Sequence, residues 1–132
     1  LTSLEDYMFS GCSSLEMLII PDNIRRLEYD VLCESGIRCL IICGELEYIR
    51  SFRAESCSNL EQIIFLNSPP ENPFGFPDEE AIGIVPDEEG RTGVCYTKAF
   101  KSRWAPNGET EWMGFPLTEY SGDLNALTFC AD

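Results

Sequence analysis

The hydrophobic positions in the first half of the chain recur at an interval of about 23 residues. The segments Leu1–Asn23, Ile24–Glu45 and Leu46–Ser68 can be stacked so that their apolar residues coincide. The coinciding sets are Leu4, Leu27 and Ile49; Leu15, Ile37 and Leu60; Leu18, Leu40 and Ile63; and Ile20, Ile42 and Phe65. Self-similarity at this period is typical of a solenoid, whose repeats bury their apolar faces against neighbouring repeats.

Each repeat predicts two short strands. Apolar and polar residues alternate over Leu15–Ile20, as in a strand, and Pro21 ends the alternation because proline cannot continue a strand ladder. A second strand is predicted at Leu1–Leu4 and at the equivalent positions of the other repeats, Ile24–Leu27 and Leu46–Ile49. The interval between the two strands is too short for a long helix, and its serine and glycine residues predict a turn.

The repeats follow the pattern L-x-x-I-x-x-x-x-F-x-x-C-x-x-L-x-x-I-x-I-P, which resembles the BspA-type leucine-rich repeat. The first repeat matches nearly throughout, the second lacks the cysteine in register and the proline, and the third has Ala54 for phenylalanine and Leu66 for proline. The resemblance implies secreted or surface-attached proteins, commonly bacterial, that engage other proteins or host surfaces. It carries over no catalytic residues.

The second half of the chain resembles the closing segment of the same family, at Ile82–Pro86, Tyr96–Phe100 and Phe115–Tyr120. The resemblance implies that a last strand and a short helix cover the open end of the solenoid. The predicted fold is therefore a β-rich α+β solenoid of leucine-rich repeats with short parallel strands. We expect three repeats over 1–68, a capping segment of the same domain over 69–120, and a tail or linker over 121–132. Because Leu1 opens in mid-repeat, we expect a piece of a longer repeat array.

The closing helix is predicted from aromatic spacing. Tyr96, Phe100 and Trp104 recur every four residues, which predicts the buried stripe of a helix of about ten residues. The basic residues of this segment fall mostly on the other side of such a helix: Lys98, Lys101 and Arg103. Two interpretations stand, a solvated basic face and a small basic patch that docks an acidic partner.

The net charge of −14 narrows the range of expected binding partners. A nucleic-acid groove needs a basic stripe, so we expect no nucleic-acid partner. The longest apolar runs, such as Met17–Ile20 and Cys39–Cys43, are far too short for membrane insertion.

Histidine is absent, which removes Ser-His-Asp and Cys-His nucleophiles and histidine-ligated metals. No P-loop, GxGxxG or GxSxG motif occurs. The acidic triplets Asp78–Glu80 and Asp87–Glu89 lack the alternate-residue spacing of a calcium loop. We therefore expect no enzymatic activity, no cofactor and no metal, and we interpret the triplets as solvated loops.

The sequence contains seven cysteines, an odd number, so at least one thiol is free or pairs between chains. Cys12 and Cys57 share a repeat position that suits a small buried residue, which favours core thiols over a disulfide ladder. A zinc site built from Cys33, Cys39 and Cys43 would lack paired CxxC spacing.

The candidate binding site is the outer face of the Leu15–Ile20 strand and its equivalents. If the core positions point inward, the intervening side chains point outward. A solvated strand face normally carries polar residues, and a contiguous apolar one marks an interaction surface. We call this set the isoleucine ladder: Met17, Ile19, Cys39, Ile41, Gln62 and Ile64. We expect the ladder to bind a protein partner or a host-surface ligand, or to form a homodimer. The alternative is that the C-terminal segment folds over the ladder or that the strands are buried on both faces.

The other strands carry charged pairs in register. Arg25 lies opposite Glu47, and Glu28 lies opposite Arg50, which predicts ion pairs on an exposed face. The sequence as a whole predicts a non-catalytic recognition or adhesion domain, and the resemblance implies an extracellular or cell-surface location. The alternative is a purely structural stalk or end cap whose binding site lies upstream.

Overall fold

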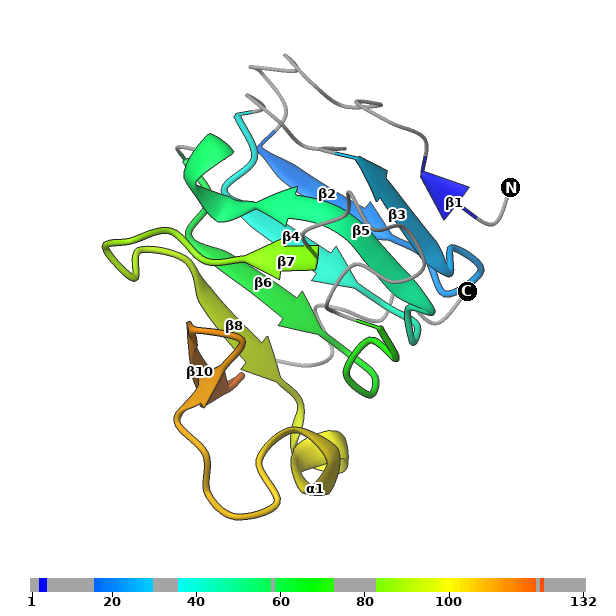
Figure 1. The fold of residues 1–132 in the computed structure, drawn as a ribbon. Coiled ribbons are helices and arrows are strands. Elements are labelled where there is room, and N and C mark those ends of the chain that lie inside the picture. Colours follow the sequence, from blue (N-terminus) through cyan, green and yellow to red (C-terminus); the bar gives the residue numbers. More distant parts are fainter. Residues whose placement is uncertain are drawn as a thin grey trace.

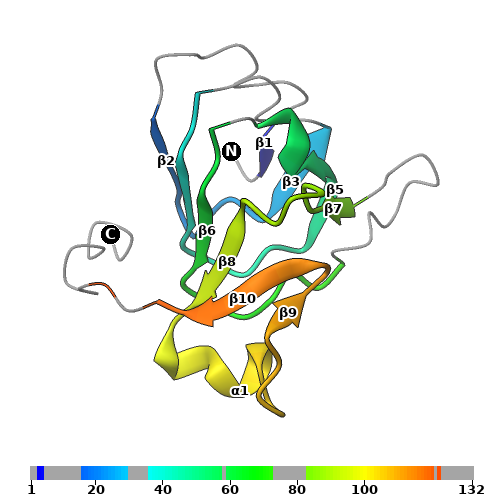
Figure 2. The same cartoon turned by 90° about the vertical axis from the view of Figure 1, so that its left-hand side faces the viewer.

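The computed structural model describes residues 3–4, 16–29, 36–57, 59–72, 83–120 and 122. Along the chain as far as residue 96, successive strands alternate between two sheets that face each other (Figures 1 and 2). The smaller sheet contains, in spatial order, β1 (Ser3–Leu4), β3 (Arg26–Tyr29), β5 (Tyr48–Arg53) and β7 (Gly83–Val85). The larger sheet contains β2 (Met17–Ile20), β4 (Cys39–Ile42), β6 (Gln62–Phe65), β8 (Gly93–Tyr96), β10 (Phe115–Glu119) and β9 (Glu111–Trp112).

Strand pairing follows the stacking that the sequence predicts. Within the described residues, neighbouring strands are parallel except for the β9–β10 hairpin. Leu18 pairs with Leu40 and Leu40 with Ile63, as the aligned apolar positions require. Leu27 likewise pairs with Leu4 and Ile49. Equivalent residues align because each repeat can bury its apolar side chains only beside those of the next repeat.

The main core fills the space between the two sheets. Ile20, Leu40, Ile42, Ile63 and Phe65 are each at most 1% exposed. Leu27 and Ile49 of the smaller sheet belong to the same buried cluster. The inward-pointing set is therefore the one predicted from the alternation of each strand.

An aromatic group lies beyond Phe65 at the end of the core. The Trp104 ring centroid is 4.7 Å from that of Phe65 and 5.0 Å from that of Trp112. The Trp104 indole N–H donates a 2.7 Å hydrogen bond to the carbonyl oxygen of Asn67, so its polar atom is satisfied despite burial. Figure 1 shows α1 (Lys101–Trp104) at the same end of the molecule as β8 and β10.

The predicted ten-residue helix is wrong in length. Tyr96 ends β8, and only a 3-10 turn, η2 (Lys98–Phe100), and the four residues of α1 are helical. Thr97 has extended backbone angles (φ −94°, ψ 153°), which separates the strand from the turn. Tyr96 and Trp104 are still buried and Phe100 half-buried, because a strand followed by a turn can return side chains to one core as a helix does. A second 3-10 turn, η1 (Ala54–Ser56), follows β5.

Candidate functional site on the outer face of the larger sheet

The isoleucine ladder forms two adjacent rows across the larger sheet. One row runs through Met17, Cys39 and Gln62, and the other through Ile19, Ile41 and Ile64. The second row continues across the sheet, because Ile64 pairs with Cys95 and Cys95 with Thr118. The structure therefore brings all six predicted residues onto one face, from β2, β4 and β6.

The ladder is buried at two of its six positions, which matches the alternative in which the strands are buried on both faces. Ile41 and Ile64 are each 1% exposed, whereas Met17 is 51% and Ile19 37% exposed. These two are the exposed large hydrophobic residues within the described part of the chain. Side chains on the outer face thus change from exposed on β2 to buried on β4 and β6.

The buried part of the ladder is a small core of its own. Ile41 and Ile64 cluster with Cys43, and half-buried Cys39, Leu66, Cys95 and Tyr120 pack against them. This second cluster is separate from the main core, so β4 and β6 are buried on both faces. Strands buried on both faces read as continuous apolar runs, which explains the Leu-Ile-Ile sequence of β4.

The polar residue of the face lies between two thiols. Gln62 Nε2 donates to Cys39 Sγ at 3.7 Å, and Cys95 Sγ donates to Gln62 Oε1 at 3.8 Å. Burial raises the pKa of both thiols, and it outweighs the opposing hydrogen bonds from Gln62 to Cys39 and from Thr118 to Cys95. Raised thiol pKa values disfavour the thiolate, which is the nucleophilic form, so this arrangement is not that of a reactive cysteine.

Cys43 stands at the end of the second cluster and is disulfide-bonded. The zinc alternative of Cys33, Cys39 and Cys43, which the sequence disfavours, also lacks one ligand, since a disulfide sulfur is not a thiolate. Cys57 is a buried thiol in the main core, as its repeat position predicts. Cys12 and Cys33 lie outside the described residues.

The charged pairs of the smaller sheet are partly as predicted. Glu28 and Arg50 form the expected ion pair, at 3.3 Å, but their side chains are only 13% and 23% exposed. Tyr48 Oη donates a 2.8 Å hydrogen bond to Glu28, and burial followed by this bond raises the pKa of Tyr48. Glu47 pairs with Arg26 at 3.2 Å instead of with the side chain of Arg25.

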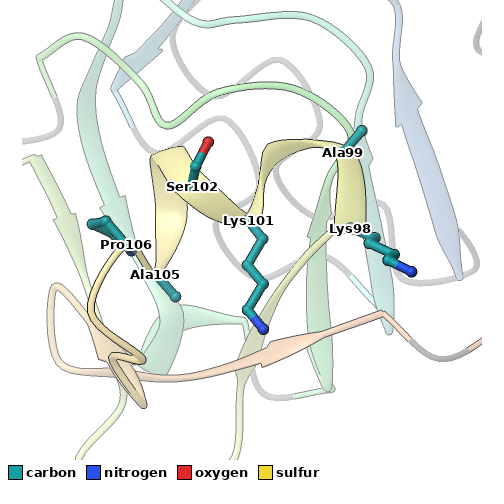
Figure 3. Close-up of a pocket in the computed structure, with 6 residues that line it drawn as sticks. All are labelled: Lys98, Ala99, Lys101, Ser102, Ala105 and Pro106. Atoms are coloured by element: carbon teal, nitrogen blue, oxygen red, sulfur yellow. The ribbon is translucent and has the colours of Figure 1, made fainter.

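The basic residues near the closing helix line a shallow surface hollow of about 430 Å³. Figure 3 shows that the Lys98 and Lys101 side chains extend to one side of the helical segment while Ser102 points away from them. Both lysines and Arg103 are exposed, as predicted. The hollow has no buried polar group among its lining residues, so its geometry fits a solvated basic face.

One acidic triplet has a structural role that its composition does not reveal. Asp87 is 7% exposed and accepts hydrogen bonds from the backbone N–H groups of Arg91 (2.9 Å) and Thr92 (3.1 Å). Burial by itself would raise the pKa of Asp87, but these bonds and the Arg91 charge lower it below its usual value. Glu88 and Glu89 are exposed. Asp78–Glu80 lie outside the described residues.

Arg91 is a structural residue that sequence reasoning missed. Its guanidinium donates to the carbonyl oxygens of Leu60 (3.3 Å), Ala54 (3.1 Å) and Cys57 (3.0 Å). Thr92 Oγ1 donates a fourth bond, of 2.8 Å, to the Leu60 carbonyl. The only available signal was an arginine among acidic neighbours, and its targets lie more than 30 residues earlier in the chain.

Among the described residues, no helix has the length and apolar character required to cross a membrane. Comparison with curated proteins and with solved structures gives no match. The family described as BspA type leucine rich repeat region (6 copies) matches residues 1–72, which is more than half of the chain. The parallel strands of that region fit the repeat solenoid. The chain belongs to the BspA-type leucine-rich repeat family.

Proposed function

We propose that this chain is a non-catalytic recognition domain of a secreted or cell-surface protein, with an adhesive role. A protein partner or host-surface ligand contacts Met17 and Ile19 on the outer face of β2. The observation that carries this proposal is the exposure of these two side chains, 51% and 37%, beside the buried Ile41 and Ile64 of the same face. Families of this repeat type generally bind proteins, which supports the assignment.

The position of the two residues favours contact with a partner. Among the described strands, β2 is the first in the order of the larger sheet, so its outer face lies at an edge of that sheet. Burying a side chain of this size contributes about 1.5–3 kcal/mol relative to leaving it exposed. The free energy gained by burying both side chains is comparable to that of a small hot spot in a protein–protein interface.

A homodimer through the whole ladder is not part of this proposal. Ile41 and Ile64 are buried within the chain and have no surface to offer a second copy.

A structural role is the second candidate, and the sheet edges favour it. Within the described residues, β1 and β2 each have one strand neighbour and lie at the same end of their sheets. A further repeat would add one strand to each sheet at that end, and its side chains would flank Ile19 on its open side. Under this alternative, residues 83–120 close the far end of the array and binding resides upstream.

The test replaces Ile19 with a photo-cross-linking phenylalanine analogue and exposes the folded domain to extracts of host cell surface and extracellular matrix. We expect a discrete cross-linked protein that disappears when Met17→Lys is added. The matched control places the same analogue at exposed Arg38, in the next strand connection. Equal cross-linking from both positions, or none from either, would favour the structural candidate.

A further inference from the structure

The backbone of β2 has one edge without a partner strand among the described residues. β2 lies first in the order of the larger sheet, and its described strand partner is β4. The Cys43 N–H donates a 2.9 Å hydrogen bond to the Ile20 carbonyl oxygen, so the backbone groups of Ile20 face β4. Successive residues of a strand direct their backbone groups to opposite edges, so those of Met17 and Ile19 face away from β4. These groups form a template on which a further strand can pair.

The main core is also incomplete at this edge. Leu18 packs against the core in one row with Leu40 and Ile63. Leu40 is 1% and Ile63 0% exposed, whereas Leu18 is only half-buried. A strand added beside β2 would flank Leu18 on the inner face and Ile19 on the outer face. Because strands buried on both faces carry continuous apolar runs, the added strand should carry one too.

The opposite edge of the larger sheet differs from β2. There β9 has only two residues, and β10 exposes Pro116 and Glu119. Short edge strands, prolines and charged residues hinder the pairing of a further strand. The four residues of β2, Met17–Ile20, are all apolar and include neither a proline nor a charge. The contrast indicates that β2 can accept a strand, whereas the opposite edge is protected.

Acidic side chains stand at both ends of β2. Glu16 directly precedes the strand and Asp22 follows it in the next turn, and both are exposed. The Arg38 N–H donates a 2.7 Å hydrogen bond to the Glu16 carbonyl oxygen, so these residues are neighbours across the strands. The Arg38 guanidinium nevertheless forms its ion pair on the other side, with Glu61 at 3.6 Å. The Glu16 carboxylate can therefore pair with a basic residue on an added strand.

These charges argue against a second copy of the chain as the added strand. A second copy would bring acidic residues at both ends of its own β2 and a net charge of −14. Like charges on neighbouring strands destabilise their pairing.

We propose that the edge of β2 binds an extended segment of the partner protein as an added strand, in which lysine or arginine flanks a continuous apolar run. Main-chain hydrogen bonds supply part of the affinity in this mode of recognition, and side chains supply the specificity. The inference rests on the proposed function, which places a partner at Met17 and Ile19, and it adds the backbone contact and the chemistry of the bound segment.

The first test measures binding of a fluorescent peptide, Lys-Arg-Val-Leu-Val-Ile-Lys-Arg, to the full chain by fluorescence polarisation. One peptide variant is N-methylated at alternate apolar residues and keeps one edge for pairing, and another is N-methylated at all apolar residues and keeps neither. We expect the first variant to bind within about twofold of the parent peptide and the second at least about tenfold more weakly, because it lacks the donors.

Two outcomes of this test would overturn the inference. Equal binding of the fully N-methylated peptide would mean that side chains dock on Met17 and Ile19 without an added strand, which leaves the proposed function in place. Absence of binding by the parent peptide would reject the stated chemistry of the segment. The cross-linking experiment at Ile19 uses no peptide, so it tests the proposed function separately.

The second test alters the edge of the protein. Ile19→Pro removes the N–H that faces away from β4 and keeps the hydrogen bonds between the two strands, since an edge strand tolerates proline there. Ile19→Ala shortens the side chain and keeps that N–H. We expect the proline variant to bind the parent peptide at least about threefold more weakly than the alanine variant. Equal affinities of the two folded variants would contradict strand addition.

The third test separates the edge from general attraction of a basic peptide to an acidic protein. Glu16→Lys is expected to weaken the parent peptide at least about threefold and to strengthen a peptide with glutamate in place of lysine and arginine. The matched control is Glu111→Lys, at an exposed residue of β9 on the opposite edge, which should leave both affinities unchanged. The same effect from both substitutions would overturn the placement of the segment on β2.

Discussion

The Arg91 guanidinium lies 3.0 Å from the carbonyl oxygen of Cys57, 34 residues earlier in the chain. It also bonds the carbonyl of Ala54, so one side chain from the segment between β7 and β8 fixes the turn that follows β5. We expect Arg91→Met to lower the free energy of unfolding by about 1.5–3 kcal/mol, because carbonyl groups lose a charged donor. Urea unfolding measures this, with exposed Arg103→Met expected to change stability by less than about 0.5 kcal/mol. An equal loss in both variants would contradict the role given to Arg91.

A matched pair of substitutions tests the boundary of the exposed face. Ile19 and Ile41 are direct partners in adjacent strands, but the first is 37% and the second 1% exposed. Ile41→Lys is expected to cost about 3–5 kcal/mol, because it buries an unpaired charge. Ile19→Lys is expected to cost less than about 1 kcal/mol, because its ammonium group reaches water. Chemical unfolding of both variants measures the two losses of stability. Similar losses would show that Ile19 and Ile41 are equally buried, against the boundary described here.

The Asp87 carboxyl group should make stability depend on pH in the acid range. Its pKa in the folded state is lowered, so its stabilising effect is complete above the unfolded value of about 4 and is lost as the pH falls through the folded value. Asp87→Asn is expected to cost about 1–3 kcal/mol at pH 7, since a backbone N–H then faces an amide donor. Unfolding at pH 7 and at pH 2 should show the difference shrinking in acid. Glu88→Gln, at the adjacent exposed carboxylate, should behave as the parent at both pH values.

The thiols of Cys39 and Cys95 should titrate above the range of an exposed cysteine. Burial raises both pKa values, so the thiolate fraction near neutral pH is small. Iodoacetamide alkylation can be followed by mass spectrometry across a range of pH. The pH at which the alkylation rate reaches half its maximum should be higher for both thiols than for a cysteine peptide. Gln62→Ala should raise the Cys39 midpoint further, because the Gln62 hydrogen bond lowers it in the parent. A midpoint at or below the peptide value would contradict the burial argument.

The closing segment shows where local spacing fails. Tyr96, Phe100 and Trp104 fit one helical stripe in sequence, yet Tyr96 lies in β8 and only Trp104 lies in α1. The four-residue interval correctly predicted shared burial and wrongly predicted the backbone. Trp112 completes the same aromatic group from β9, beyond the turn at Pro106 and Asn107 that follows α1.

The sequence alone determined the strand registers, because Leu18, Leu40 and Ile63 can be buried only by stacking on one another. It also determined which side chains point to the main core, since alternation along a strand is a local property. It did not determine that Ile41 is buried while its partner Ile19 is exposed. That difference depends on residues far apart in the chain, such as Cys95 and Tyr120, which pack against the cluster of Ile41 and Ile64 only in the folded protein. The same holds for Arg91, whose role is set by carbonyl groups that only the folded chain brings within 3.3 Å.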